Sequence, residues 1–106
     1  MDEKDISLML DSLGIETSAF KILCHLTFSH KEVKPAEISD KLSMKPGTVR
    51  ARLSELKEAK LVSMDGDGYI SNLTAYDIIT KVYKQTRKDI SEAMKSERRE
   101  DSRHEQ

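Results

Sequence analysis

The sequence is poor in cysteine, aromatic residues and long apolar runs, and each shortage excludes a class of protein. Aromatic residues make up 5% of the 106 positions, and tryptophan is absent. A single cysteine forms neither an internal disulfide nor a zinc site by itself, and we interpret Cys24 as a core residue rather than a redox thiol. No apolar run approaches the ~18 residues of a membrane span. The acidic N-terminus is unlike a signal peptide, which predicts a cytoplasmic protein.

Catalytic and metal-binding patterns are also missing. The histidines show no spacing typical of a metal site: His25, His30 and His104. There is neither a glycine-rich phosphate loop nor a nucleophile elbow. Asp65-Gly66-Asp67-Gly68 resembles the middle of an EF-hand loop, but Ser63 and Thr74 then occupy the two positions that need Asp and a bidentate Glu. We therefore expect no enzyme, no metal site and no cofactor.

Charge is segregated along the chain, although the net charge is only −1. Residues 17–62 carry nine bases and five acids, for +4, whereas residues 1–16 sum to −4 and residues 63–77 to −3. Residues 78–106 carry +2. Because an electrostatic field decays over about 8 Å at physiological salt, the local positive block matters more to a nucleic acid than the total charge.

Apolar periodicity predicts two helices in the first third of the chain. One face of residues 5–13 is apolar: Ile6, Met9, Leu10 and Leu13. Gly14 is expected to close this helix in a left-handed cap. A second helix is expected from about residue 17 to residue 30, with Thr17 or Ser18 as its N-cap.

Residues 34–62 predict a helix-turn-helix. Pro35 suits the first turn of a helix because its missing N–H costs nothing there. Residues 43–45 form the turn, and a second helix is expected from Pro46 to about Lys60. The expected inner faces are Ala36, Ile38 and Leu42 in the first helix, and Val49, Leu53 and Leu56 in the second. Two amphipathic helices joined by so short a turn are the signature of this motif.

Residues 61–72 predict a β-hairpin, because two short β-prone runs flank Asp-Gly-Asp-Gly. A hairpin directly after a helix-turn-helix is the wing of a winged helix. The predicted fold is mainly α with a small β-hairpin, that is, a winged helix-turn-helix with a long C-terminal dimerisation helix.

Residues 73–95 predict that C-terminal helix, and it carries two apolar stripes. Leu73, Ile78 and Val82 are expected to pack back on the domain. The second stripe alternates steps of three and four residues, as a coiled-coil seam does, and it predicts a homodimer interface: Tyr76, Ile79, Tyr83, Thr86, Ile90 and Ala93. The expected organisation is an N-terminal helix (1–14), a winged helix-turn-helix domain (15–72), a dimerisation helix (73–95) and a disordered tail (96–106) without apolar residues.

The pattern Ala-Glu-Ile-Ser-x-Lys-Leu, a turn, then Thr-Val-Arg-x-Arg-Leu-x-x-Leu-x-x-x-x-Leu-Val resembles the winged helix-turn-helix repressors of the MarR and TrmB-like groups. Leu13-Gly14-Ile15 before a helix is similar to TrmB-like proteins in particular, which suggests an archaeal origin. The resemblance covers roughly residues 13–71 and implies a DNA-binding regulator. TrmB-like proteins of full length carry a sugar-binding domain that this sequence lacks, so no sugar effector is implied.

In that fold the second helix of the motif enters the major groove of DNA. The arginine fork matches guanine O6 and N7. Arg50 is the first candidate for reading a base because it shares a face with Ser54, whereas Arg52 is displaced round the helix and is as suited to a phosphate. Thr48, near the helix start, suits a phosphate. The whole candidate set is Lys34, Lys41, Lys45, Thr48, Arg50, Arg52 and Ser54. The alternative is that Arg50 and Arg52 are solvated and pair with Glu55 or Glu58.

The predicted wing carries Asp65 and Asp67, which phosphate would repel, so it either stands off DNA or serves another surface. The predicted function is a homodimeric regulator that binds specific sequences in double-stranded DNA. One alternative is a winged-helix protein–protein interaction module of a transcription or other nucleic-acid complex. Another is a sequence-independent nucleoid protein, which the near-neutral charge disfavours. We expect no membrane partner, and the sequence leaves a small-molecule effector open.

Overall fold

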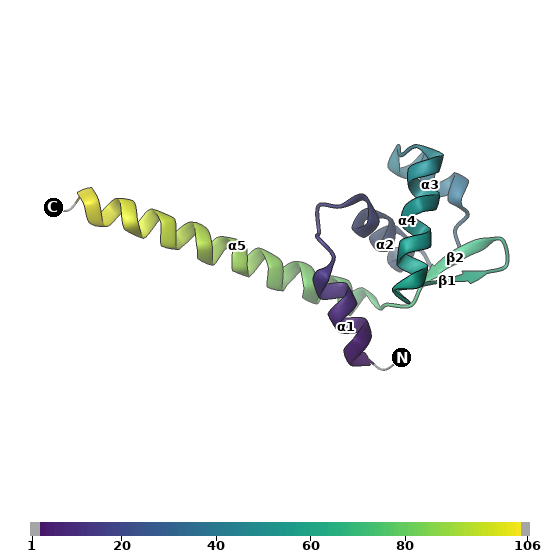
Figure 1. The fold of residues 1–106 in the computed structure, drawn as a ribbon, viewed down its shortest axis with the longest axis horizontal. Coiled ribbons are helices and arrows are strands. Elements are labelled where there is room, and N and C mark those ends of the chain that lie inside the picture. Colours follow the sequence, from purple (N-terminus) through teal and green to yellow (C-terminus); the bar gives the residue numbers. More distant parts are fainter. Residues whose placement is uncertain (1–2, 105–106) are drawn as a thin grey trace.

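The computed structural model describes the backbone of residues 3–104 and the side chains of residues 8–95. Residues 3–104 form five helices and one hairpin, in the order α1 (Glu3–Ser12), α2 (Ser18–Phe28), α3 (Pro35–Leu42), α4 (Pro46–Glu58), β1 (Val62–Asp65), β2 (Gly68–Ser71) and α5 (Ala75–His104). Figure 1 shows α2, α3, α4 and the hairpin gathered into one body, from which α5 projects as a long arm. The expected fold class is confirmed. Within the described part of the chain, no helix combines the length and apolar character needed to cross a membrane.

The helix α2 lies at the centre of the core. Its N-cap is Thr17, whose Oγ1 accepts a hydrogen bond from the Phe20 N–H at 3.1 Å, as the sequence predicted. Ile22 and Leu23 have no exposed surface. Because α2 contacts α3, α4, β2 and α5, it fixes the positions of the other elements around it.

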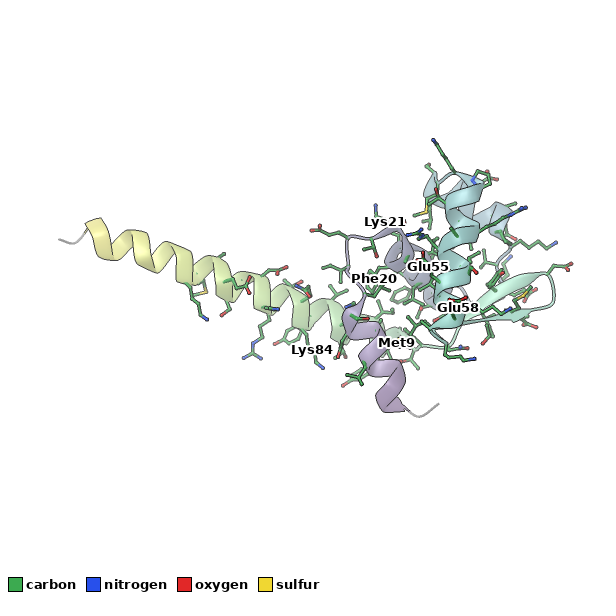
Figure 2. All side chains as sticks on the ribbon, in the orientation of Figure 1. Met9, Phe20, Lys21, Glu55, Glu58 and Lys84 are labelled. Atoms are coloured by element: carbon green, nitrogen blue, oxygen red, sulfur yellow. The ribbon has the colours of Figure 1, made fainter. Side chains whose placement is uncertain are left out.

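The expected cap at Gly14 is wrong, because Gly14 is not in the left-handed region. Its carbonyl instead accepts hydrogen bonds from the backbone N–H and the hydroxyl of Thr17, so the link between α1 and α2 is an ordinary turn. In α1 the side chain of Leu10 is buried, whereas Met9 is exposed (Figure 2). Ile6 lies outside the residues whose side chains are described.

The helix-turn-helix is confirmed, with α3 and α4 packed through Ile38, Val49 and Leu53. A residue with positive φ that is not glycine follows each helix: Ser43 (53°) directly after α3, and Lys60 (66°) two residues after α4 ends at Glu58. Just beyond α4 the Leu61 N–H reaches the Leu56 carbonyl at 3.0 Å, and beyond α3 the Met44 N–H reaches the Ser39 carbonyl at 3.1 Å. These are Schellman-type ends, in which a left-handed residue turns the chain sharply.

The inner face of α3 differs from the prediction, whereas that of α4 agrees with it. Ile38 is buried and Leu42 packs against the core at its margin, but Ala36 is exposed, so the inner face of α3 is narrower than expected. In α4, Val49, Leu53 and Leu56 are all buried, as predicted. A helix of eight residues has only about two turns, which leaves room for one fully buried position and its neighbours.

The wing is a hairpin with the register Val62↔Ser71 to Asp65↔Gly68, so only Gly66 and Asp67 lie in the turn. Gly66 has φ +62°, which suits the first central position of a type II′ hairpin turn. A segment distant in sequence also pairs with β2, because Val33 and Tyr69 exchange two backbone hydrogen bonds of 3.0 and 2.9 Å in an antiparallel bridge. A Cβ at Gly68 would lie 3.0 Å from the Val33 carbonyl oxygen, so this approach requires glycine.

One stripe of α5 packs on the body, but its residues differ in part from those predicted. Leu73 and Ile78 are buried as expected, but Val82 is exposed and Lys81 is buried in its place, with 5% of its surface exposed. The Lys81 Nζ lies 3.4 Å from the Asp11 carbonyl oxygen and 5.9 Å from the centre of the Phe20 ring. The aliphatic stem of lysine packs like an apolar side chain while its ammonium finds polar partners.

The helix α5 also extends to His104, beyond the end expected near Met94. Residues 96–104, which were expected to be disordered, are helical, and residues 105–106 lie outside the described residues. The absence of apolar side chains does not prevent helix formation, since Glu, Lys and Arg have good helix propensity.

Candidate nucleic-acid interface

The outward side of α4 is a ridge of small side chains. The helix turns by 3.6 residues, so the side opposite Val49 and Leu53 carries Gly47, Ala51 and Ser54. All three are exposed, and a Cβ at Gly47 would meet nothing within 4 Å. Because these side chains are short, a flat polar surface such as a groove edge can approach the backbone of α4 closely.

Basic side chains lie on one flank of this ridge. Arg50 is exposed and lies beside the start of α3, in a shallow hollow that Pro35, Ser39 and Asp40 also line. Lys57, seven residues further along α4, is exposed on the same flank, and its Nζ lies 3.6 Å from the Met64 sulfur in β1. Lys57 is not among the residues predicted from the sequence to bind DNA, although its spacing of two helical turns from Arg50 indicates that both lie on the same side of the helix.

Arg52 lies on the other flank and is already paired. Its Nη2 lies 3.2 Å from the Glu55 carboxylate, and the two side chains are 38% and 56% exposed. An exposed pair of this kind contributes about 0–1 kcal/mol, and it neutralises much of the charge. The buried Nε of Arg52 has no hydrogen-bond partner. The geometry therefore separates the two arginines: Arg50 is available to a ligand, whereas Arg52 is directed to its own helix.

Lysines stand at the start of both helices of the motif. Lys34 and Lys45 are the N-cap residues of α3 and α4, each followed by proline, and neither helix has a side-chain cap. The first-turn N–H groups therefore add to the positive potential of these lysines. Thr48 is exposed in the first turn of α4, close to Lys45 in sequence. Lys41 lies apart from this group, in the last turn of α3.

The wing presents acidic rather than basic side chains. Asp65 and Asp67 are both exposed at the end of the hairpin. The base of the wing is fixed by Asn72, whose side-chain amide donates to the Lys60 carbonyl at 2.9 Å and accepts from the Ser63 hydroxyl at 3.0 Å. The acidic tip is thus held in a defined position relative to α4.

The second apolar stripe of α5 is open to solvent. Tyr76, Ile79, Tyr83 and Ile90 are 76%, 59%, 63% and 54% exposed, and Thr86 and Ala93 are exposed beside them. The six predicted interface residues therefore share one face, and the body does not cover it.

The rest of the described chain offers no comparable chemistry. No group of three His, Cys, Asp or Glu side chains among the described residues has a metal-binding arrangement. Burial raises the pKa of the Cys24 thiol, which opposes thiolate formation. Cys24, predicted to be a core residue, is half-buried and packs against the core at its margin, where it lines an open apolar groove together with Phe20, Phe28 and Leu42.

Together, the packed helix-turn-helix, the exposed α4 and the hairpin define a winged-helix DNA-binding domain. Comparison with protein families agrees, because residues 18–96 match the model of the winged helix-turn-helix transcription repressors described as HrcA DNA-binding. The chain belongs to this family, and it is a DNA-binding transcription regulator domain. The family is not one of enzymes.

A solved structure supports the fold. The activation domain of the phage T4 transcription factor MotA superposes with a TM-score of 0.59 at 20% sequence identity, over 86% of this chain and 95% of that domain. At this identity the likeness establishes the fold alone. Among curated proteins, no sequence matches the chain. These comparisons confirm neither the finer resemblance to the MarR and TrmB-like groups nor an archaeal origin, and both stay predictions.

Proposed function

We propose that the protein is a homodimeric transcription regulator that inserts the N-terminal half of α4 into the major groove of specific DNA sequences. The observation that carries the proposal is the exposed ridge of Gly47, Ala51 and Ser54, flanked by Arg50. A small-residue ridge with one free arginine combines close approach with a side chain whose fork fits the edge of guanine.

Within this proposal the candidate residues have different roles. Arg50 and Ser54 face the base edges, since they are exposed one helical turn apart on α4. Lys34, Lys45 and Thr48 contact phosphates from the first turns of α3 and α4, where helix dipole and lysine charge add. These contacts set the register of the protein on DNA, and base contacts supply its specificity.

Two candidates contribute less. Lys41 lies at the far end of α3 and reaches only a flanking phosphate. Arg52 has Glu55 at 3.2 Å, so it contacts phosphate only by giving up that pair. We place Lys57 on the flank of Arg50 as an additional phosphate contact, because it is exposed and lies two turns away.

Dimerisation supplies the rest of the affinity. One recognition helix reads few base pairs, whereas two helices related by a two-fold axis read two half-sites about 34 Å apart. The open stripe of α5, from Tyr76 to Ala93, is the proposed dimer interface, because α5 is the element that projects from the body (Figure 1). The predicted operator is therefore palindromic.

A second candidate function is protein binding through the wing. The exposed Asp65 and Asp67 favour it, since they repel DNA phosphates and attract a basic protein surface. In the leading proposal the wing stands off DNA, and in the second candidate it is the contact surface.

Selection of bound duplexes from a random pool tests the leading proposal with the full chain. A palindromic consensus is expected, and binding of the selected duplex should weaken steeply as salt rises, with a slope set by the number of phosphates neutralised. Pools that remain random after selection, or binding that is insensitive to salt, would contradict the proposal. Retention of no duplex at low salt would favour the protein-binding alternative.

A further inference from the structure

Among the described residues, nothing packs against the outer part of α5. From Thr86 to Lys95 every residue is exposed, and these include Ile90 and Met94, with 54% and 47% of their surfaces in solvent. Exposed apolar side chains contribute to stability only when another surface covers them. The apolar stripe from Tyr76 to Ala93, here called the seam, therefore favours a covering surface that matches its shape.

The side chains of the seam become smaller with distance from the body. Near the body it carries the bulky Tyr76, Ile79 and Tyr83, all exposed. Further out it carries the smaller Thr86 and Ala93, with Ile90 between them. This gradient gives the seam a direction, and a direction distinguishes the two ways in which copies can pair.

A two-fold axis between Lys84 and Gln85 matches the seam to itself when the helices run in opposite directions. Tyr76 then opposes the partner's Ala93, Ile79 opposes the partner's Ile90, and Tyr83 opposes the partner's Thr86. In every layer the side chains are either one large and one small or two of equal, intermediate size. Alternation of large and small residues across facing positions fills a core at native density.

Parallel pairing lacks this complementarity. It places each residue opposite its own copy, so that Tyr83 meets Tyr83 of the partner subunit in one layer and Ala93 meets Ala93 of the partner subunit in another. The first layer is crowded and the second leaves a void, and both cost stability. From this asymmetry, and resting on the proposed homodimer, we infer that two copies pair through α5 in antiparallel orientation about an axis between Lys84 and Gln85.

The body leaves space for such a partner. Ile78 and Lys81, which are buried, lie on the opposite side of α5 from Ile79, Tyr83 and Ile90. A partner helix on the seam therefore runs along the side of α5 that faces away from α1 and α2. Figure 1 shows the first turns of α5 beside α1 and the rest of the helix extending away from the body.

Charged residues beside the seam do not oppose this orientation. Arg87 flanks the seam on one side and Asp89 on the other. In the antiparallel register the nearest flanking residue to Arg87 is the partner's Thr80, and the nearest to Asp89 is the partner's Val82. No like charges face each other directly, so packing decides the orientation.

The orientation determines where the two bodies lie. In the antiparallel pair the two Tyr76 positions are separated by 17 residues along the axis, or about 26 Å at 1.5 Å per residue. The bodies then lie at opposite ends of the paired helices, further apart than this distance, because each body lies beyond the N-terminal end of its own α5 (Figure 1). Such a dimer suits half-sites separated by a multiple of the helical turn of DNA. In a parallel pair the two bodies would lie side by side at one end.

Disulfide trapping distinguishes the orientations in the full chain. Cys24 is first replaced by serine, and Ile79→Cys and Ile90→Cys are then made separately in this background. Both positions are exposed, so the substitutions should leave the fold intact, as far-UV circular dichroism can verify. Each variant alone and an equimolar mixture are equilibrated, oxidised with oxidised glutathione and separated on a non-reducing gel.

Antiparallel pairing predicts several-fold more covalent dimer in the mixture than in either variant alone. A disulfide requires Cβ atoms about 4 Å apart, and two copies of the same position lie about 16 Å apart along the antiparallel axis. Covalent dimers in the single-variant samples, without enrichment in the mixture, would establish parallel pairing and overturn the inference while leaving the homodimer intact. The absence of covalent dimer in all three samples would contradict the homodimer itself.

Discussion

Apolar side chains are buried in the body of the molecule but exposed in the outer half of α5. In the body, Ile22, Leu23 and Ile38 have no exposed surface. In residues 86–95 every side chain is exposed, including Ile90. The body is therefore stabilised by its own core, whereas the stripe on α5 contributes stability only when another surface covers it. The two regions should respond differently to the same substitution.

The largest effect is expected from Ile22→Ala in the body, with Ile90→Ala as the matched substitution on α5. Truncation of a fully buried isoleucine should lower the free energy of unfolding by about 2–5 kcal/mol. Ile90→Ala removes the same atoms from an exposed site, so in dilute protein it should change that free energy by less than about 0.5 kcal/mol. Urea titration followed by circular dichroism measures both. Equal losses would break the distinction between the two regions.

A charge placed on the seam should separate dimerisation from folding. Ile79→Lys puts an ammonium into the proposed interface, where in the antiparallel pair it meets the apolar Ile90 of the partner subunit. We expect the dimer dissociation constant to rise by about 100-fold, because a charge buried without a partner is strongly unfavourable. Sedimentation equilibrium measures the constant, and Lys88→Glu, on the opposite face of α5, is the control. A variant that unfolds, rather than dissociates, would show that the stripe belongs to the body.

Removal of the free arginine of α4 should impair DNA binding without changing either region's stability. Arg50→Ala is expected to weaken binding to the selected duplex by about 1–3 kcal/mol and to relax the preference at one base position. Lys84→Ala removes the same charge from α5, apart from α3 and α4 (Figure 2), and should have little effect. Fluorescence anisotropy at moderate salt compares them. If Arg50→Ala keeps both affinity and preference, α4 does not read bases through this residue.

The smallest effect concerns Lys81, where the two regions meet. Burial lowers the pKa of the Lys81 ammonium, while the Asp11 carboxylate raises it and only partly offsets the burial. Since the folded-state pKa lies below the unfolded value, the unfolded chain binds more protons between them, and stability should rise with pH in the alkaline range. Lys81→Met should abolish this rise at little cost in stability. A Lys81→Met variant with an unchanged alkaline profile would contradict the assignment.

Local patterns in the sequence predicted most of the body. The spacing of Val49, Leu53 and Leu56 predicted the inner face of α4, and the preference of hydroxyl side chains for N-caps placed the start of α2 at Thr17 or Ser18, of which the structure has Thr17. Such features depend on neighbours within one or two turns, which a sequence displays directly. The wing followed from Asp-Gly-Asp-Gly for the same reason.

Features that depend on distant residues were not predictable in this way. The pairing of Val33 with Tyr69 joins segments 36 positions apart, and nothing near either residue indicates it. Lys81 is buried only because Asp11 and Phe20 are folded against it, so periodicity assigned Val82 instead. In the candidate interface, the sequence left open whether Arg52 pairs with an acidic side chain. The answer depends on side-chain rotamers, which place the Arg52 Nη2 3.2 Å from the Glu55 carboxylate.

The wing also bears on aggregation, because an unpaired edge strand can start a β-sheet between molecules. Val33 covers one edge of the hairpin, but within the described residues β1 pairs with β2 alone, so its other edge has no strand partner. An open edge is a template for strand addition by a second chain. Strand β1 is only four residues long and ends in Asp65, and short, charged edge strands resist such addition. Replacing the acidic residues of the wing by neutral ones would therefore remove a protection against intermolecular sheet formation.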